Sequence, residues 1–275
     1  MFCVIFFGEK DGLMRVINLA SGSKGNCTFI EAGKTKVLVD IGLTVAELSK
    51  RLEIIGEQPE NIDAVVITHE HIDHIKGLSV FLKNYDVRAY IHEEVILKLG
   101  NTLKLNLDKV SLIGKYYFSV NDVKFVPFDL PHDSINCLGF SVEYKSNKVS
   151  FVTDLGYMPS RAMELVRGSQ LVYIESNHDK KLMRDCKYPY IVKQRIMGDN
   201  GHLSNEQAAN VVVELAKSGT KHFVLSHISE NSNTIETAYL TNAKALESAG
   251  FVLEKDVFLR YSRQDRPGNN YRFGE

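Results

Sequence analysis

The sequence predicts an α+β fold in which two β-rich halves lie between outer helices. Three patterns lead to this class: strand-like and helix-like runs alternate over the first 92 residues, a meander of strand-like runs follows, and the alternation then resumes. The expected strands are residues 15–20, 27–31, 35–40, 64–68, 87–92, 115–120, 123–130, 138–144, 148–152 and 251–261. The expected helices are residues 44–55, 75–85, 161–167, 205–217 and 234–248.

Local signals mark several boundaries of these elements. Residues 145–148, Lys-Ser-Asn-Lys, form the expected hairpin turn within the meander. Ser204 and Gln207 have the spacing of a capping box at the start of one helix, and Gly250 ends the last helix. No internal repeat, low-complexity segment or Pro/Gly-rich linker divides the chain, so we expect one domain over residues 14–275. Residues 1–13 are expected to be a loose N-terminal extension.

Composition is that of a globular cytoplasmic enzyme. The 275 residues are 44% hydrophobic and 24% charged, and the formal net charge is −1. No apolar run approaches the roughly 20 residues that a membrane helix needs, and the first residues lack the pattern of a signal peptide. The four cysteines are scattered with no Cys-x-x-Cys pair, so we expect reduced thiols. These features predict a cytoplasmic protein that does not bind membranes.

The most informative run is Thr-His-Glu-His-Ile-Asp-His at residues 68–74, which follows an apolar strand. His69 and His71 are two apart, so an extended backbone directs both imidazoles to one side. Asp73 and His74 follow where the chain turns into the next helix. Imidazole and carboxylate suit zinc and related metals, and four such groups in six residues can fill most of two metal sites.

Further motifs place this run in a known family. Asp40 ends an apolar strand, His132 follows Leu130-Pro131, and Asp154 and His227 each follow a later strand. In this order, the motifs resemble those of the metallo-β-lactamase fold hydrolases. The resemblance implies a four-layer αββα sandwich, which agrees with the two β-rich halves.

The resemblance also implies two divalent metal ions, zinc or manganese. One ion is expected to bind His69, His71 and His132. The other is expected to bind Asp73, His74 and His227, while Asp154 bridges both. The counterpart of Asp40 supports the ligand loop through hydrogen bonds and binds no metal. Two cations acting on one water lower its pKa toward neutrality and make it a nucleophile.

Relatives of this fold cleave many bonds, and three features favour phosphodiesters. No cysteine stands among the second-metal positions, where many zinc β-lactamases have one. The run Gly-His-Leu-Ser-Asn-Glu-Gln at 201–207 is similar to the segment of transfer-RNA 3′-processing nucleases that carries a catalytic histidine, here His202. Glu175 ends an apolar strand where those nucleases have its carboxylate partner. An imidazolium paired with a carboxylate is a suitable acid for the departing sugar oxygen.

The catalytic residues are therefore expected to be Asp73, Glu175, His178 and His202. For His178, the sequence leaves three roles open: it contacts phosphate, touches the metal site, or caps the following helix.

Two segments resemble those of the YycJ/WalJ family of bacterial metallo-hydrolases. These are Ala-Ser-Gly-Ser-Lys-Gly-Asn at 20–26 and Glu-Ser-Asn-His-Asp at 175–179. The family is associated with 5′-to-3′ exonuclease action on double-stranded DNA and a part in mismatch repair. This resemblance makes Ser21, Ser23 and Asn26 candidate substrate contacts. Only 47 residues lie between Asp154 and His202, too few for the β-CASP domain of RNase J-type nucleases.

A basic cluster follows the Glu175 motif and is interleaved with tyrosines. Lys180, Lys181 and Arg184 are its candidate phosphate contacts, since cations with aromatic side chains suit a nucleic acid end. The alternative for this cluster is a solvated charged surface.

The resemblance thus implies a metal-dependent 5′-to-3′ DNA exonuclease. Two alternatives stay open: an enzyme for small or cyclic phosphodiesters, and an RNA-processing nuclease. A non-enzymatic binding module would be expected to lack ligands, and none is missing. The sequence leaves the oligomeric state undecided.

Overall fold

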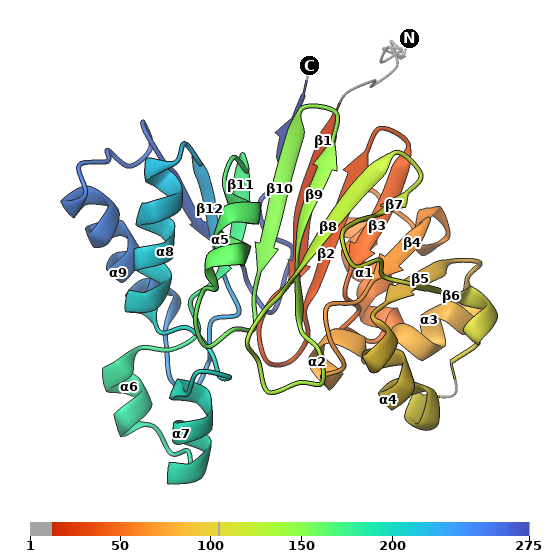
Figure 1. Ribbon diagram of the computed structural model, residues 1–275, viewed down its shortest axis with the longest axis horizontal. Coiled ribbons are helices and arrows are strands. Elements are labelled where there is room, and N and C mark those ends of the chain that lie inside the picture. Colours follow the sequence, from red (N-terminus) through yellow and green to blue (C-terminus); the bar gives the residue numbers. More distant parts are fainter. Residues whose placement is uncertain (1–12, 104, 275) are drawn as a thin grey trace.

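The computed structural model describes residues 13–103 and 105–274; apart from Leu13, the predicted N-terminal extension lies outside these residues. Two seven-stranded sheets face each other in the described part of the chain (Figure 1). The first has the order β14-β1-β2-β3-β4-β5-β6, with β1 (Met14–Ala20), β2 (Cys27–Ala32), β3 (Thr35–Val39), β4 (Ala64–Val66), β5 (Arg88–Ile91), β6 (Val110–Leu112) and β14 (Tyr271–Phe273). The second has the order β13-β12-β11-β10-β9-β8-β7, with β7 (Phe118–Val120), β8 (Val123–Asp129), β9 (Leu138–Tyr144), β10 (Asn147–Val152), β11 (Leu171–Glu175), β12 (His222–Ser226) and β13 (Phe258–Tyr261).

Each sheet is antiparallel on one side and parallel on the other. Strands β1, β2 and β3 pair antiparallel, whereas β3 to β6 run parallel. In the same way, β7 to β10 pair antiparallel and β10 to β13 run parallel. Parallel strands bring their carboxyl ends to one edge of a sheet, which is where open α/β sheets bind ligands.

Three apolar layers hold the sandwich together. Between the sheets, side chains such as Ile30 and Val37 of the first pack with Phe125 and Phe140 of the second. Helices α1 (Val45–Ile54), α3 (Leu78–Asn84) and α4 (Glu93–Leu103) cover the outer face of the first sheet. Helices α5 (Ser160–Val166), α8 (Asn205–Lys217) and α9 (Ile235–Ser248) cover the second.

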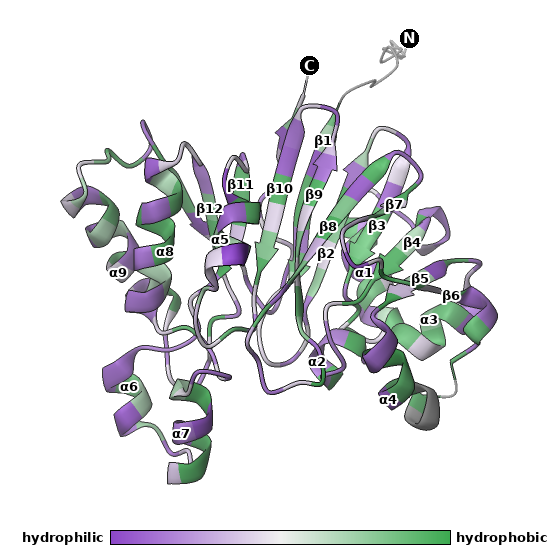
Figure 2. Cartoon of the chain, in the orientation of Figure 1, coloured by the Kyte–Doolittle hydropathy of each residue, from purple (hydrophilic) through white to green (hydrophobic). Residues whose placement is uncertain are grey.

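Figure 2 shows both hydrophobic and hydrophilic residues on α8, as expected for a helix with one face on a sheet. The predicted capping box of Ser204 and Gln207 begins this helix. The four-layer αββα fold predicted from the sequence is confirmed. Among the described residues, no helix is both long enough and apolar enough to cross a bilayer.

The predicted helix over 75–85 is wrong in one respect, because the chain forms two helices here. Helix α2 spans Ile72–Ile75, and α3 begins at Leu78. The break lies at Gly77, whose N–H donates to the carbonyl of Ile41 at 2.9 Å. A Cβ at Gly77 would lie 2.3 Å from the carbonyl oxygen of Leu43, so only glycine permits this approach. The earlier start places Asp73 and His74 inside α2.

The predicted strand over 251–261 is also shorter than expected. Residues 252–256 turn, with the Val252 N–H bonded to Oδ2 of Asp256 at 2.8 Å and Glu254 at φ 62°. Strand pairing starts only at Phe258.

Several elements were not predicted from the sequence. They are α4, β6, β14, α6 (Lys180–Asp185), α7 (Tyr190–Met197) and two 3-10 turns at Pro59–Asn61 and Leu107–Lys109. The interval between Asp154 and His202 holds α5, β11, α6 and α7. Helices α6 and α7 stand apart from the sandwich in Figure 1, at the end where α2 lies.

Candidate metal centre and active site

The predicted site residues meet at the carboxyl edge of the parallel strands in both sheets. Asp40 follows β3, and His69 and His71 lie between β4 and α2. From the second sheet, Asp154 follows β10 and His227 follows β12. The fold therefore brings together side chains that are up to 187 positions apart in the sequence (40 to 227).

Three of these residues have a backbone conformation that non-glycine residues rarely adopt. Asp40, Asp154 and His227 have φ values of 62°, 65° and 53°. Asp40 and His227 directly follow the last residue of a strand, and Asp154 lies two residues after the end of its strand. At each position, the left-handed conformation turns the chain sharply. Such strain persists only where surrounding contacts fix it, and it concentrates at functional sites. Here, the Asp40 N–H donates to Val66 at 2.9 Å and the His227 N–H donates to Oγ of Ser21 at 2.7 Å.

The potential ligand atoms form four overlapping groups among the described residues, and two of these groups contain the predicted ligand sets. One atom from each of His69, His71 and His132 lies within 4.8 Å of the others, and the same holds for Asp73, His74 and His227. Asp154 lies between the groups: its Oδ2 is 3.4 Å from Nε2 of His74, and its Oδ1 is 4.0 Å from Nε2 of His132. This arrangement corresponds to the predicted division of ligands between two ions.

The chemistry of these groups fits cations. Nε2 of His69, Nε2 of His227 and Oδ2 of Asp154 are buried and have no hydrogen-bond partner in the described structure. A buried polar atom without a partner is costly, and all three atoms belong to the predicted ligand set. A metal ion at each group would supply the missing partner. The residues present therefore suit two divalent ions.

Electrostatics in the metal-free protein point the same way. Burial lowers the pKa of His69 well below its ordinary value, and the neighbouring His74, His132 and His71 lower it further. Burial also acts to lower the pKa of His74, but Asp40, Asp154 and Asp73 outweigh it and raise the pKa. The pKa of His227 is likewise raised, by Asp154 above all, despite burial. Without metal, protons on His74 and His227 thus balance part of the negative charge of the nearby carboxylates. A bound metal ion would balance that charge instead.

Asp40 contacts the ligand loop as the resemblance implied. Its Oδ1 accepts from the Thr68 N–H at 2.9 Å, and its Oδ2 lies 2.7 Å from Nδ1 of His74. Nε2 of His74 is left facing Asp73 and Asp154. A carboxylate behind a histidine fixes the ring and its tautomer, as is common around metal ligands.

Glu175 is fully buried and accepts from four donors. Its Oε1 lies 2.8 Å from Nδ1 of His202 and 2.7 Å from Nδ1 of His227. Its Oε2 accepts from the N–H groups of Leu203 at 3.0 Å and Leu155 at 3.2 Å. Burial raises its pKa, but His202 and His227 outweigh that effect and lower the pKa below its ordinary value. The predicted pairing of Glu175 with His202 is present, and His227 is a further partner that sequence reasoning missed.

His178 is buried as well. Its Nδ1 has no hydrogen-bond partner in the described structure, and burial lowers its pKa to about 4. The residue that caps α6 is Asp179, whose Oδ1 accepts from Lys181 and Leu182. The helix-cap alternative for His178 is therefore wrong, because the carboxylate of the next residue fills that position. A catalytic role for His178 stays a prediction.

The segment at residues 20–26 contacts the site from the first sheet. Oγ of Ser21 accepts from the backbone of His227, and Nδ2 of Asn26 donates to Oδ2 of Asp73 at 3.1 Å. Ser21 is buried and Ser23 is exposed. The contacts of Ser21 and Asn26 are thus with predicted metal ligands. Substrate binding by these three residues stays a prediction.

The three basic candidates lie on α6. Lys180, Lys181 and Arg184 are all exposed, and Nζ of Lys180 lies 4.0 Å from Oε2 of Glu206. Helix α6 begins five residues after Glu175, the last residue of β11.

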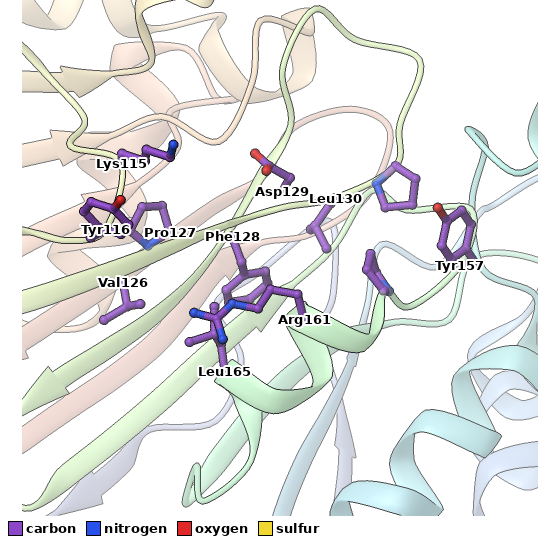
Figure 3. A pocket seen from close by; sticks show the side chains of 12 residues that line it. Lys115, Tyr116, Val126, Pro127, Phe128, Asp129, Leu130, Tyr157, Arg161 and Leu165 are labelled. Atoms are coloured by element: carbon purple, nitrogen blue, oxygen red, sulfur yellow. The ribbon is translucent and has the colours of Figure 1, made fainter.

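A cavity lies between β8, α5 and the loops that carry His132 and Asp154. Its volume is about 580 Å³, and Figure 3 shows Tyr116, Tyr157, Lys115 and Arg161 around it. Pro131, one residue before His132, also lines it. The cavity thus offers aromatic and cationic side chains directly beside the ligand loops.

Comparisons with known proteins agree with this geometry. Residues 35–228 match the family described as "Beta-lactamase superfamily domain". This chain belongs to that superfamily. The resemblance inferred from the five motifs is confirmed, and membership makes the chain a metal-dependent hydrolase.

Relatives place the chain in the YycJ/WalJ family of the superfamily. Exodeoxyribonuclease YycJ of Bacillus anthracis is 34% identical over 243 residues, which cover 85% of this chain and 89% of the relative. Exodeoxyribonuclease WalJ of Streptococcus pneumoniae is 34% identical over 237 residues, covering 84% and 87%. The crystal structure of the metallo-beta-lactamase fold protein YhfI from Bacillus subtilis has a TM-score of 0.72 at 15% identity, covering 95% of this chain and 100% of that chain. At this identity, YhfI shows the superfamily fold alone.

Sequence reasoning missed two contacts at the edge of the centre. Nδ2 of Asn177 donates to the carbonyl of His227 at 3.0 Å, and Nε of Arg195 donates to Oδ2 of Asp133. The sequence analysis singled out the run 175–179, which contains Asn177, but it did not predict the bond from Asn177 to His227, 50 residues later.

Proposed function

We propose that the domain over residues 14–275 is a binuclear metal hydrolase of phosphodiester bonds, acting in the cytoplasm as a 5′-to-3′ DNA exonuclease. The observation that carries this proposal is the pairing of buried Glu175 with partly exposed His202 beside the two groups of potential ligands. The names of the YycJ and WalJ relatives support DNA as the substrate. The aromatic and cationic cavity and the exposed cations of α6 would suit a nucleic acid strand.

His69, His71 and His132 would hold one ion, Asp73, His74 and His227 the other, and Asp154 would contact both. Zinc or manganese, when bound, would activate water and stabilise charge on the phosphate. The chain's own residues then supply the remaining chemistry. Asp40, Glu175 and Ser21 hold His74 and His227 in place through hydrogen bonds, so no reorganisation of these ligands is needed during reaction.

His202 would be the general acid. Glu175 occupies Nδ1 of its ring, which leaves Nε2 to carry a proton to the departing 3′ oxygen. The His202 side chain is 17% exposed, so it can reach a bound strand while its carboxylate partner stays dry. His178 is the second candidate for contact with the phosphate.

Digestion of end-labelled nucleic acids by metal-loaded protein tests the proposal. The substrates are single- and double-stranded DNA and RNA, each labelled at the 5′ or the 3′ end. We expect mononucleotide release from the 5′ end of DNA, and no release by the Asp154→Ala variant. Activity on a cyclic nucleotide or a chromogenic phosphodiester, with none on DNA or RNA, would instead select the small-substrate enzyme. Preference for RNA would select the RNA-processing alternative.

A further inference from the structure

Arg195 lies on α7, close to the predicted ligand His132. Its Nε donates to Oδ2 of Asp133, the residue that follows His132. The other oxygen of Asp133, Oδ1, lies 3.4 Å from Nε2 of His132. One carboxylate therefore links the guanidinium to a potential ligand atom and places Arg195 at the rim of the metal centre.

The guanidinium faces solvent with donors to spare. The Arg195 side chain is 57% exposed, and within the described part of the chain its one hydrogen-bond partner is Asp133. Because that bond uses Nε, both Nη groups are available. A guanidinium with both Nη groups available can bind phosphate oxygens through two parallel hydrogen bonds.

Backbone contacts tie Arg195 to the predicted acid as well. The N–H of His202 donates to the carbonyl of Ile196 at 2.8 Å, and Nδ1 of His132 lies 3.0 Å from the carbonyl oxygen of Gly201. A Cβ at Gly201 would lie 2.3 Å from the carbonyl oxygen of Arg195, so a glycine is needed for this close packing. The end of α7, the His132 loop and the His202 loop thus form one connected unit.

A purely structural role would leave this placement unexplained. Exposed ion pairs contribute little to folding stability, so a brace for α7 gains little from this one. The bond from Nε to Asp133 holds the guanidinium at this place and leaves both Nη groups available.

We infer that Arg195 binds a backbone phosphate of the substrate strand that flanks the scissile bond, and that Asp133 is its positioning residue. The Asp133 carboxylate stands between the guanidinium and His132, so a phosphate on Arg195 and a phosphate at the metal ligands are two different groups. This inference rests on the proposed nucleic acid hydrolase function and assigns a contact to it.

Neutral phosphate analogues test the contact. DNA oligonucleotides carry a methylphosphonate, which lacks the negative charge, at each position flanking the scissile bond in turn. With native DNA, Arg195→Ala should raise KM by about 10- to 100-fold, the range of a lost charge-assisted phosphate contact, with little change in kcat. With the methylphosphonate at the contacted position, wild-type protein and Arg195→Ala should have the same KM. On bis(4-nitrophenyl) phosphate, which has no flanking phosphate, both proteins should also be equal.

Binding and control variants separate this role from a structural one. The Kd of a cleavage-resistant phosphorothioate strand, measured by fluorescence anisotropy, should rise in parallel with KM. Asp133→Asn keeps the arginine but weakens the hydrogen bond that positions it. This variant should therefore raise KM, by several-fold less than Arg195→Ala does. Lys217→Ala removes an exposed cation paired with Glu214 on α8, away from the site, and should leave KM unchanged. Metal content and melting temperature should match the wild type in all three variants.

An equal loss by Arg195→Ala on native, methylphosphonate and chromogenic substrates would overturn the inference, since the arginine would then act through the His202 loop. Wild-type cleavage of DNA with an unchanged Arg195→Ala variant would also overturn it while leaving the proposed function intact. Wild-type protein that hydrolyses the chromogenic diester and no nucleic acid would overturn both.

Discussion

Glu175 positions His227 as directly as it positions His202: its Oε1 lies 2.7 Å from Nδ1 of the first ring and 2.8 Å from Nδ1 of the second. A single carboxylate oxygen thus joins a predicted metal ligand to the predicted acid. The substitutions of Glu175 and His202 should therefore differ in their effect on metal binding.

Glu175→Gln should lower both metal affinity and turnover. The amide removes the charge that favours a bound His227, and its NH2 group cannot accept from the N–H groups of Leu203 and Leu155 as Oε2 does. We expect a loss of about 10- to 100-fold in affinity for one of two ions, measured by competition with a chelator. His202→Ala is the matched control and should keep wild-type affinity. Equal metal affinity in Glu175→Gln and wild-type protein would contradict this role.

His202→Ala should keep both metals and bind DNA nearly normally, yet lose about 10²–10⁴-fold in rate, the span that a general acid supplies. The loss should shrink on a nitrophenyl phosphodiester, because that leaving group needs little protonation. Single-turnover rates on both substrates measure the difference. The same fractional loss on both substrates would assign His202 a structural role.

Metal-saturated protein should carry close to two divalent ions per chain, because seven predicted ligands exceed what one tetrahedral site uses. His71→Ala and Asp154→Ala should each abolish turnover and reduce the metal content. Elemental analysis after removal of free metal measures the ratio. One ion per chain under saturating metal, or full activity in either variant, would rule out the binuclear centre.

The metal-free protein should become less stable as the pH rises. Carboxylates raise the folded-state pKa of His74 and His227 above the unfolded value of about 6.5. Their contribution is therefore complete below that value and is lost as the pH rises through the folded pKa. Metal affinity should rise over the same range, because ligation needs neutral imidazoles. Urea unfolding with a chelator, from about pH 6 to about pH 9, measures the slope, and a flat profile would contradict these pKa shifts.

Ser21→Ala should destabilise the protein by about 1–3 kcal/mol, because the buried His227 N–H loses its acceptor. Metal affinity should fall as well, since that bond fixes a left-handed residue. Ser23→Ala is the control: Ser23 is exposed, so its loss should change the free energy of unfolding very little. Denaturant midpoints of the two variants test the contrast. Equal denaturant midpoints for Ser21→Ala and Ser23→Ala would show that the Ser21–His227 bond does not contribute to folding stability.

Much of the fold could be predicted because the apolar periodicity of the helices and strands agrees with the capping and turn signals that end them. The meander and the capping box at Ser204 follow from local rules that tertiary contacts did not override. The prediction of one helix over 75–85 was wrong because Gly77 packs closely against the carbonyl of Leu43, and no local sequence pattern indicates this contact. Helices α6 and α7 were missed because they are short and each buries almost nothing, so apolar periodicity is weak there.

The predicted metal ligands could be found from the sequence because their residue types and their order along the chain are distinctive. His69 and His71 stood out because imidazoles two apart after a strand are unusual. By contrast, the Ser21 hydroxyl bonds to a backbone 206 residues away, and Asp133 pairs with a cation 62 residues away. Such contacts depend on how strands are ordered in the two sheets, which one sequence does not specify. The sequence therefore marked Ser21 as a candidate substrate contact without indicating its bond to His227.

The segment between β11 and α8 leaves and rejoins the sandwich at one point. His178 and Ser204 form a parallel bridge, and the Asn205 N–H donates to the carbonyl of His178 at 2.9 Å. Everything in between, with α6 and α7, is a closed excursion whose two ends are fastened to each other. Residues 180–193 of this segment carry the exposed cations of α6 and lie outside the unit formed by the end of α7, the His132 loop and the His202 loop. A graft of residues 180–193 from one family member to another is therefore a direct way to transfer substrate preference while the catalytic centre is kept.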